Sequence, residues 1–597
     1  MVDAPTPEPA SEPGPERGPE RIVRVLPDPP AIDKTFDYLV PEQLGDQVRV
    51  GSVVRVTLHG RRVGGWVVAD DVGRDPLHAR RQLQPIAKVT GWGPPADLIE
   101  LADWASWRWA GRPAHFLRTA SPDQAVRHLP TLGSSSPPIH VVPDELLAEA
   151  FAAPRAVLRL PPAADPYPVA LHAAVRGHAL ILCPSADRAR HLGLRMRRAG
   201  VTVAIMPRDW ALARAGATVV GSRAAAWAPV RDLAAVVVLD EHDEAWQQEQ
   251  APTWNARDVA AERARRAGVP CVLVSAMPSL EAQAWGELIV ASRGAERDGW
   301  PKVDVIDRRH DDPGRAGLFS ERLVAALRSG GRVVCVLNRK GRSRLMACTS
   351  CGEVAHCERC EASVVLSDEG TFDCARCGAT RPPICLACGG TTFKNLRAGV
   401  TRVREELEAL AKTPVVEVTG ATRDLRLDEA RVYVGTEAVL HQLESADVVA
   451  FLDFDQELLA PRYRAAEEAF ALLVRAGRLV GGRRGDGRVL VQTRLPGHEV
   501  IQAAVLADPA RVSAAEADRR ALMRFPPVTA MAAVSGASAP AFIEALERAA
   551  FPGVEVLGPS DGQWLLRSDR HATLLDALAA TPRPPGRLRV TVDPLRL

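Results

Sequence analysis

The sequence has 597 residues, more than one hydrophobic core normally serves, so we expect several domains. A hydrophobic fraction of 46% is ample for packed cores, and a formal net charge of +2 excludes a protein that binds nucleic acids through a large overall positive charge. No apolar run approaches the roughly 20 residues of a membrane span and no charged-then-apolar leader begins the chain, so we expect a cytoplasmic protein with no membrane partner.

The N-terminal part of the chain changes character twice. Residues 1–20 are rich in Pro, Glu, Gly and Ser, a composition that predicts a disordered tail. Residues 21–95 alternate short β-type runs with turn residues, which predicts a small β domain. Residues 96–165 begin with a helical pattern over 97–118 and continue through Pro- and Ser-rich stretches. This pattern predicts a second small domain or a linker.

Two α/β lobes and a smaller domain are expected after residue 165. Near-continuous Val, Ile and Leu runs separated by helical segments predict parallel strands covered on both faces, with a first lobe at 166–300 and a second at 301–340 and 396–497. Residues 498–597 predict a small α+β domain. The fold class is therefore a multidomain α/β protein, and residues 341–395 are an insertion in the second lobe.

That insertion holds eight of the eleven cysteines as four Cys-x-x-Cys pairs. Two such pairs complete a closed tetrahedral site for structural zinc, so eight ligands predict two zinc ions. A disulfide framework is the alternative, but it requires an oxidising compartment and is typical of small chains. Two short strand-like runs between the second and third pairs predict that those pairs share one ion. The outer site would use Cys348, Cys351, Cys385 and Cys388, and the inner site Cys357, Cys360, Cys374 and Cys377.

The tandem lobes suggest a nucleoside-triphosphate motor, and the first one carries a matching acidic pair. Asp240 and Glu241 end a buried strand, where a motor would hold Mg²⁺ and activate water. The phosphate loop G-x-x-x-x-G-K-[ST] is absent, and its place is taken by the proline-rich stretch 160–168. Proline lacks the backbone N–H that cradles phosphate, so we interpret the acidic pair as the remnant of a dismantled ATP site.

Several stretches together resemble the family of primosomal protein N′ (PriA), the bacterial replication-restart helicases. The resemblance spans nearly the whole chain beyond the tail and is specific in the order and spacing of its motifs. The stretches that carry it are KTFDYLVP at 34–41, GSRAAAWAP at 221–229, the Asp-Glu-His segment at 240–242, residues 247–258, SAMP at 275–278, LNRKG at 337–341 before the cysteines, and LMRFPP at 522–527.

The departures from the family pattern all fall on ATP-handling motifs. The acidic motif is one residue shorter than the family's Asp-Glu-Glu-His, and Met277 replaces a threonine. His441 and Gln442 stand where Lys-Gly is expected, and the arginine-finger region is altered at 474–483. Loss of such elements costs orders of magnitude in hydrolysis. We therefore expect a degenerate family member, with ATP and Mg²⁺ not expected as cofactors.

The resemblance also implies a fold and a DNA site. It implies a 3′-DNA-binding domain at 21–95, a winged-helix-like domain or linker at 96–165 and two RecA-like helicase lobes around the cysteine module. Phe36, Asp37 and Gly60 match the family's pocket for the 3′ end of a nascent strand, whereas the pocket lysine aligns near Gln84. By residue type alone, Phe36 would be a core residue and Asp37 a turn residue.

Two further clusters have open interpretations. Trp104, Trp107 and Trp109 fit either core packing at helical spacing or a docking surface for the tail of single-stranded-DNA-binding protein. A basic cluster lying among glycines either contacts phosphates or forms a solvated loop. Its members are Arg475, Arg478, Arg483, Arg484 and Arg488.

The resemblance implies a protein of replication restart that recognises stalled or branched forks and DNA 3′ ends and helps to reload the replicative helicase, without helicase activity of its own. Its expected partners are forked and single-stranded DNA, single-stranded-DNA-binding protein, other primosome components and the replicative helicase, in the nucleoid region of the cytoplasm. One alternative is an active ATP-dependent 3′-to-5′ helicase with an unrecognised phosphate cradle. The other is a zinc-ribbon protein that acts on RNA or transcription complexes.

Overall fold

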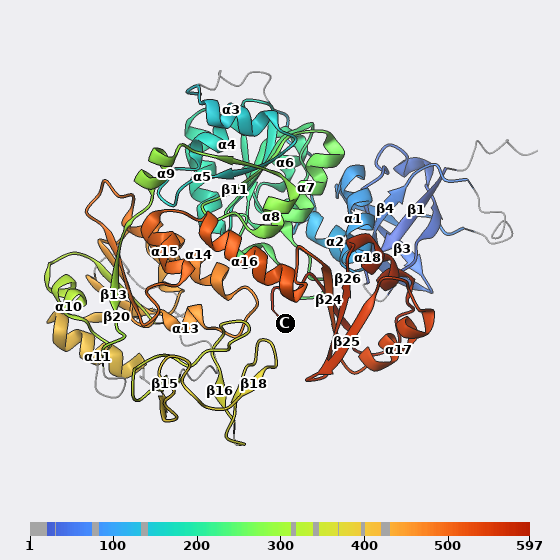
Figure 1. Ribbon diagram of the computed structural model, residues 1–597. Helices are drawn as coiled ribbons and strands as arrows, with labels where there is room; N and C mark the ends of the chain where they lie inside the picture. Colours follow the sequence, from blue (N-terminus) through green and yellow to red (C-terminus); the bar gives the residue numbers. More distant parts are fainter. Residues whose placement is uncertain are drawn as a thin grey trace, which may run out of the picture.

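The computed structural model describes residues 21–29, 32–73, 83–132, 141–311, 318–337, 346–367, 369–395, 400–418 and 430–596 (Figure 1). The tail expected at 1–20 and most of the LNRKG stretch, at 338–341, lie outside these residues. None of the described helices is long and apolar enough to cross a bilayer.

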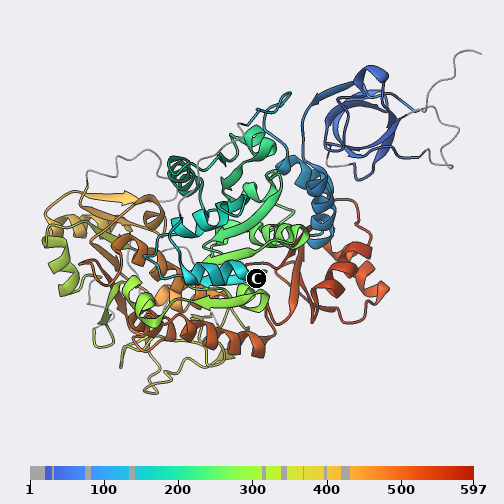
Figure 2. The ribbon, with the colours of Figure 1, turned by 90° about the horizontal axis from the view of Figure 1, so that it is seen from above.

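Five antiparallel strands near the N-terminus curve into a barrel, in the order β2-β1-β4-β3-β5 (Figure 2). Leu39 closes the ring, because its N–H donates to the carbonyl of Gln84 at 3.0 Å and its own carbonyl accepts from Ile86 at 2.9 Å. Alternating valines fill the interior, as the two-residue period of a strand dictates. The strands are β1 (Ile22–Pro27), β2 (Phe36–Leu39), β3 (Val53–Leu58), β4 (Arg61–Ala69) and β5 (Lys88–Gly91).

The tryptophan segment forms two helices, not the single helix expected at 97–118. Helix α1 (Ala96–Arg108) ends where Ala110 takes a positive φ of 46°, and α2 (Pro113–Ala120) begins at a proline, which is well tolerated there. Trp109 is fully buried and meets Trp104 edge to face at 5.3 Å. Trp104 and Trp107 are half-buried against the same core. Core packing is therefore the interpretation that fits these side chains.

A parallel seven-stranded sheet forms the first lobe, in the order β12-β6-β11-β10-β7-β9-β8. The sheet includes β6, so the first lobe starts before residue 166. We had expected it to start at residue 166. Helices α3, α4 and α5 cover one face, and α7 lies on the other. The strands are β6 (Arg155–Arg159), β7 (His178–Leu182), β8 (Val203–Ile205), β9 (Thr218–Gly221), β10 (Leu233–Leu239), β11 (Cys271–Ser275) and β12 (Glu287–Val290), and the helices are α3 (Glu145–Ala152), α4 (Tyr167–Ala174), α5 (Ala186–Arg198), α6 (Trp210–Gly216), α7 (Ala256–Ala267), α8 (Leu280–Trp285) and α9 (Arg293–Gly299).

A second parallel sheet, of six strands, has the order β13-β23-β22-β14-β21-β20. Helices α10 and α11 cover one face, and α14 and α15 cover the other. The strands are β13 (Lys302–Asp307), β14 (Val333–Val336), β20 (Val415–Val418), β21 (Val432–Gly435), β22 (Val448–Phe451) and β23 (Arg488–Thr493), and the helices are α10 (Glu321–Arg328), α11 (Val400–Ala411), α12 (Val439–Gln442), α13 (Asp455–Leu458), α14 (Ala465–Val480) and α15 (Glu499–Leu506).

The cysteine stretch is inserted between β14 and β20, as expected. Its short strands are β15 (Met346–Cys348), β16 (Val365–Leu366), β17 (Phe372–Asp373), β18 (Thr380–Arg381) and β19 (Phe393–Asn395). In Figure 1 this module lies below the second lobe, on the side away from the first.

The C-terminal part is an antiparallel sheet in the order β25-β26-β24-β27. Residues Val500, Ile501 and Val512 pack in the core of the second lobe, so the expected domain boundary at 498 falls too early. The elements are α16 (Ala510–Met523), β24 (Ala530–Ser535), α17 (Ala539–Ala549), β25 (Glu555–Ser560), β26 (Gln563–Ser568), α18 (His571–Ala580) and β27 (Arg589–Val592).

One hydrophobic core joins three of these parts. It runs from Leu26 and Trp66 on the barrel, through α1 and α2, to the α7 face of the first lobe and to the C-terminal sheet. Figure 1 shows α1 and α2 between the barrel, the first lobe and α18. A continuous apolar core resists relative motion of the parts that it joins, so the barrel is held in a defined position on the first lobe.

Candidate functional site

Four identical turns organise the cysteine module. In each turn the residue after a Cys-x-x-Cys pair donates its N–H to the carbonyl of the first cysteine at 2.9 Å. The φ of that residue is positive: 78° at Gly352, 61° at Glu361, 69° at Gly378 and 76° at Gly389. Glycine adopts this conformation without steric cost. Three of these positions are glycines, whereas Glu361 takes the same conformation without that signal in its residue type.

The turns bring the eight cysteine side chains into two clusters. One contains Cys348, Cys351, Cys385 and Cys388, and the other contains Cys357, Cys360, Cys374 and Cys377. The closest Sγ atoms across each cluster lie 3.5–3.6 Å apart, and all eight thiols are free. A disulfide would require a bond of about 2.05 Å. Four sulfurs each about 2.3 Å from a central ion are some 3.8 Å apart, so both donor sets are consistent with zinc.

The module is attached firmly to the second lobe. The N–H of Ser363 donates to the carbonyl of Leu459 at 2.6 Å, and Arg376 donates to the carbonyl of Tyr463 at 3.0 Å. Arg494 donates to the carbonyl of Gly352 at 3.2 Å. Three separate anchors hold the two clusters as one body with the lobe.

The acidic pair at the end of β10 lies between the two lobes, and both carboxylates already have partners. Asp240 is bound by Arg188 of α5 in the first lobe and by both terminal nitrogens of Arg478 of α14 in the second. Burial alone would raise the pKa of Asp240, but the attraction of the two guanidinium groups outweighs burial and holds that pKa far below its usual range. Asp240 is thus a carboxylate whose oxygens face arginine.

Glu241 is held equally firmly within the first lobe. It accepts hydrogen bonds from the N–H of Ser279 at 2.7 Å and from the Ser279 hydroxyl at 2.8 Å, and Arg257 lies 3.2 Å away. Its side chain is fully buried. In this arrangement Glu241 orients the start of α8 and has no water-facing oxygen with which to act as a base.

The loop that follows β6 has few free backbone donors. Leu160 donates to the carbonyl of Ser275, Ala163 to Gly299 and Ala164 to Pro161, each at about 3.0–3.1 Å. Tyr167 donates to the carboxylate of Asp165, and residues 161, 162, 166 and 168 are prolines without an N–H. A phosphate cradle consists of several N–H groups that point at one anion. This loop does not provide one.

The basic cluster predicted as a loop is partly helical. Arg475 and Arg478 lie on α14 and reach across to the first lobe, where Arg475 contacts Asp243 at 3.2 Å. Arg484 and Arg488 form exposed pairs with Asp298 and Asp304. The interpretation of the cluster as a solvated loop is therefore wrong for the two residues on α14.

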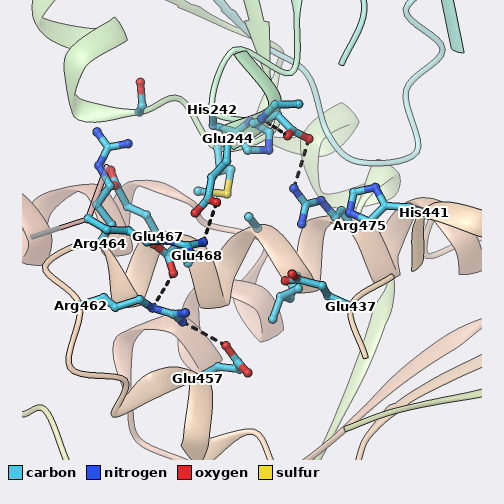
Figure 3. A pocket seen from close by; sticks show the side chains of 17 residues that line it. His242, Glu244, Glu437, His441, Glu457, Arg462, Arg464, Glu467, Glu468 and Arg475 are labelled. Carbon is cyan, nitrogen blue, oxygen red and sulfur yellow. Dashed lines mark hydrogen bonds and ion pairs between the residues drawn. The ribbon is translucent and has the colours of Figure 1, made fainter. Parts of the chain in front are cut away.

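A polar cavity of about 360 Å³ opens beside these contacts (Figure 3). Charged residues of both lobes line it. Arg462 pairs with Glu468 within the second lobe, and Arg475 contacts Asp243 of the first lobe. Burial raises the pKa of Glu468 to about 7 in spite of the nearby Arg462. Arg596, the last but one residue of the sequence, also lines the cavity and pairs with Glu244 at 3.0 Å. Ion pairs between the described residues thus line this cavity between the lobes.

The barrel places the three residues of the expected 3′-end pocket at different depths. Asp37 on β2 accepts from the Nε of Arg24 at 2.9 Å and is 18% exposed, while Phe36 is half-buried at the edge of the barrel core. Gly60 occupies the open tip of the β3–β4 hairpin with a φ of 78°. The Tyr38 hydroxyl donates to the carbonyl of Thr57 at 3.1 Å, which ties β2 to the strand that leads into this tip. Gln84 lies beside Leu39, two residues from Asp37.

Comparison with known proteins shows that this sequence resembles those of replication restart proteins. Residues 24–122 match the family described as the PriA 3′DNA-binding domain (3′BD). The probable replication restart protein PriA of Mycobacterium leprae is 29% identical over 592 residues, which is 89% of this chain and 90% of that protein. The PriA of Bacillus subtilis is 29% identical over 319 residues, 48% of this chain and 39% of that one.

Among solved structures, a DEAD box protein from Methanococcus jannaschii covers 61% of this chain and 87% of its own, with 11% identity and a TM-score of 0.30. These sequence matches extend from the barrel through both lobes to the C-terminal part. Over most of its length the chain is therefore similar to the replication restart proteins of the PriA family.

Proposed function

We propose that this protein recognises DNA 3′ ends at branched replication forks and acts in replication restart as a DNA-binding scaffold that neither hydrolyses ATP nor unwinds DNA. The match of residues 24–122 to a 3′DNA-binding domain supports the first part. The double arginine contact of Asp240 is the observation that carries the second.

A carboxylate can hold Mg²⁺ only through oxygens that are free to approach the ion. Both oxygens of Asp240 contact guanidinium groups, and the cationic Arg478 and Arg188 would repel a divalent ion. Binding of Mg²⁺–ATP would require these ion pairs to the buried Asp240 to break and would leave the arginines to find new partners. The proline-rich loop would still supply no phosphate cradle.

The proposal extends to the two cysteine clusters, which we assign to two structural zinc ions. Four-thiolate sites are closed, so zinc here would stabilise the module without taking part in chemistry. The module would then present a rigid surface on the second lobe to other primosome components, such as single-stranded-DNA-binding protein or the replicative helicase.

Forked DNA is expected to cause no ATP hydrolysis, and calorimetry is expected to detect no binding of Mg²⁺–ATP. A coupled ATPase assay with and without a fork that carries a 3′-OH measures turnover. The Asp240→Asn and Glu241→Gln variants identify contaminating activity, because a contaminant is indifferent to them. DNA-stimulated hydrolysis that these variants abolish would establish the helicase alternative.

Replacing Asp37 with Ala is expected to reduce the preference for a free 3′-OH over a 3′-phosphate end by about tenfold or more, because a hydrogen bond to a charged group contributes about 1.5–3 kcal/mol. Fluorescence anisotropy with the two fork ends measures the preference. Asp70→Ala is the matched control, since Asp70 pairs with Arg21 in the same barrel. An unchanged preference in the Asp37 variant would remove that residue from the site.

Elemental analysis of protein purified without chelators is expected to find two zinc ions per chain. The double variant Cys351→Ser/Cys388→Ser should retain one, because it removes two ligands of the outer cluster only. Cys183→Ser, which changes a buried thiol of the first lobe, should retain both. Absence of zinc from the unmodified protein, or two ions in the double variant, would contradict the assignment.

A further inference from the structure

A row of cations occupies the outer face of the barrel on strands β3, β4 and β5. Arg55 on β3 lies opposite Lys88 on β5 and opposite Gly64 on β4, and Thr57 lies opposite Arg62. Opposed residues of an antiparallel pair project to the same side of the sheet. Arg55, Arg62 and Lys88 therefore share one face, which we call the basic face, while Val54 and Val56 between them point into the barrel core.

The basic face is exposed and its charges are available. All three side chains are exposed, and among the described residues none of them makes an ion pair or a side-chain hydrogen bond. Other arginines of this region behave differently: Arg21 pairs with Asp70, and Arg24 pairs with Asp37.

The acidic residue beside the basic face is already neutralised. Asp28 approaches Gly64, and its carboxylate is held by Arg118 at 2.7 Å. The face therefore keeps a net positive charge within a chain whose overall charge is almost zero.

The spacing of the three cations suits a nucleic-acid backbone. Neighbouring strands lie about 4.8 Å apart and alternate residues of a strand about 6.7 Å apart, so the three charges extend over roughly 10 Å. One DNA strand carries a phosphate about every 3.4 Å of helix axis. Two or three consecutive phosphates can lie within reach of the basic face without any change in the sheet.

The position of the face relates it to the expected 3′-end pocket. At one end the same sheet surface is covered, because Trp66 packs on α1 and α2 and donates to the hydroxyl of Ser121 at 2.8 Å. At the other end it reaches the exposed hairpin tip formed by His59, Gly60 and Arg61. Figure 2 shows the barrel projecting from the body of the molecule, so a duplex has access from outside.

We propose that the basic face binds the phosphates of the duplex arm that ends in the recognised 3′ terminus, and so aligns that terminus with the hairpin tip at Gly60. This rests on the proposed function, since it adds a surface for the same DNA. The pocket residues would select the end, and the basic face would supply affinity that is independent of sequence and sensitive to salt.

The triple variant Arg55→Ala/Arg62→Ala/Lys88→Ala tests the basic face directly. Each lost phosphate contact is expected to reduce the slope of log K against log salt by about 0.9, so three contacts reduce it by about 2.7. Between 50 and 200 mM salt, the loss of affinity for forked DNA should then be about 40-fold smaller than in the unmodified protein. The preference for a free 3′-OH should persist, because Asp37 is unchanged.

The control variant Arg190→Ala/Arg198→Ala/Lys412→Ala removes the same number of exposed cations from the two lobes and should keep the original slope. The single charge reversal Arg62→Glu provides a second measurement if the triple variant melts earlier than the unmodified protein. If both barrel variants keep the original salt slope while fork binding stays intact, the proposal that the basic face binds phosphates is wrong, and the proposed function is unaffected. Failure of the unmodified protein to bind forks would instead overturn the proposed function.

Discussion

The carboxylate of Asp240, held between Arg188 and Arg478, is the interaction on which the relation of the two lobes depends. Arg478 belongs to the second lobe and Asp240 to the first, so this ion pair joins the two lobes directly. Removing one partner of a buried ion pair typically costs about 3–5 kcal/mol, because the other charge is left without compensation. The lobes are therefore stabilised in one arrangement by the chain itself.

Further ion pairs strengthen the same junction. Arg464 of the second lobe contacts Glu281 of the first, and the fully buried Arg520 binds Glu281, Glu467 and Glu516 together. A ligand can shift a conformational equilibrium only through different affinities for its two states. Under the proposed function no Mg²⁺–ATP binds, so this arrangement would not shift, and the lobes would serve to keep the DNA-binding barrel and the cysteine module at fixed positions.

Local patterns in the sequence predicted much of the fold. The β domain expected at 21–95 is present as a five-stranded barrel, and the eight cysteines form the two expected groups because each turn needs only neighbouring residues. The absence of the phosphate-loop motif could also be recognised in the sequence, because its place is taken by prolines, which have no N–H to donate. Strand β6 was missed because its short apolar run, with an arginine at each end, resembles many loop segments.

Features that depend on distant residues could not be predicted. Asp240 and Arg478 are 238 positions apart, and nothing near either residue indicates its partner. The glycines around Arg475 and Arg478 suggested a loop, but burial of Phe470, Leu473 and Val474 against the second sheet makes a helix of that segment. Glu361 likewise takes a left-handed conformation that its residue type does not indicate, because the turn around the cluster imposes it.

The distance between the lobes tests the central claim most directly. Fluorophores attached without cysteine chemistry at the exposed positions 190 and 412 report on the first and second lobes by energy transfer. We expect one narrow distance distribution that Mg²⁺–ATP leaves unchanged with or without forked DNA, and a broader one in Arg478→Ala, which lacks the inter-lobe contact to Asp240. A shift of the unmodified protein on addition of Mg²⁺–ATP would contradict the claim that arginines have replaced the nucleotide.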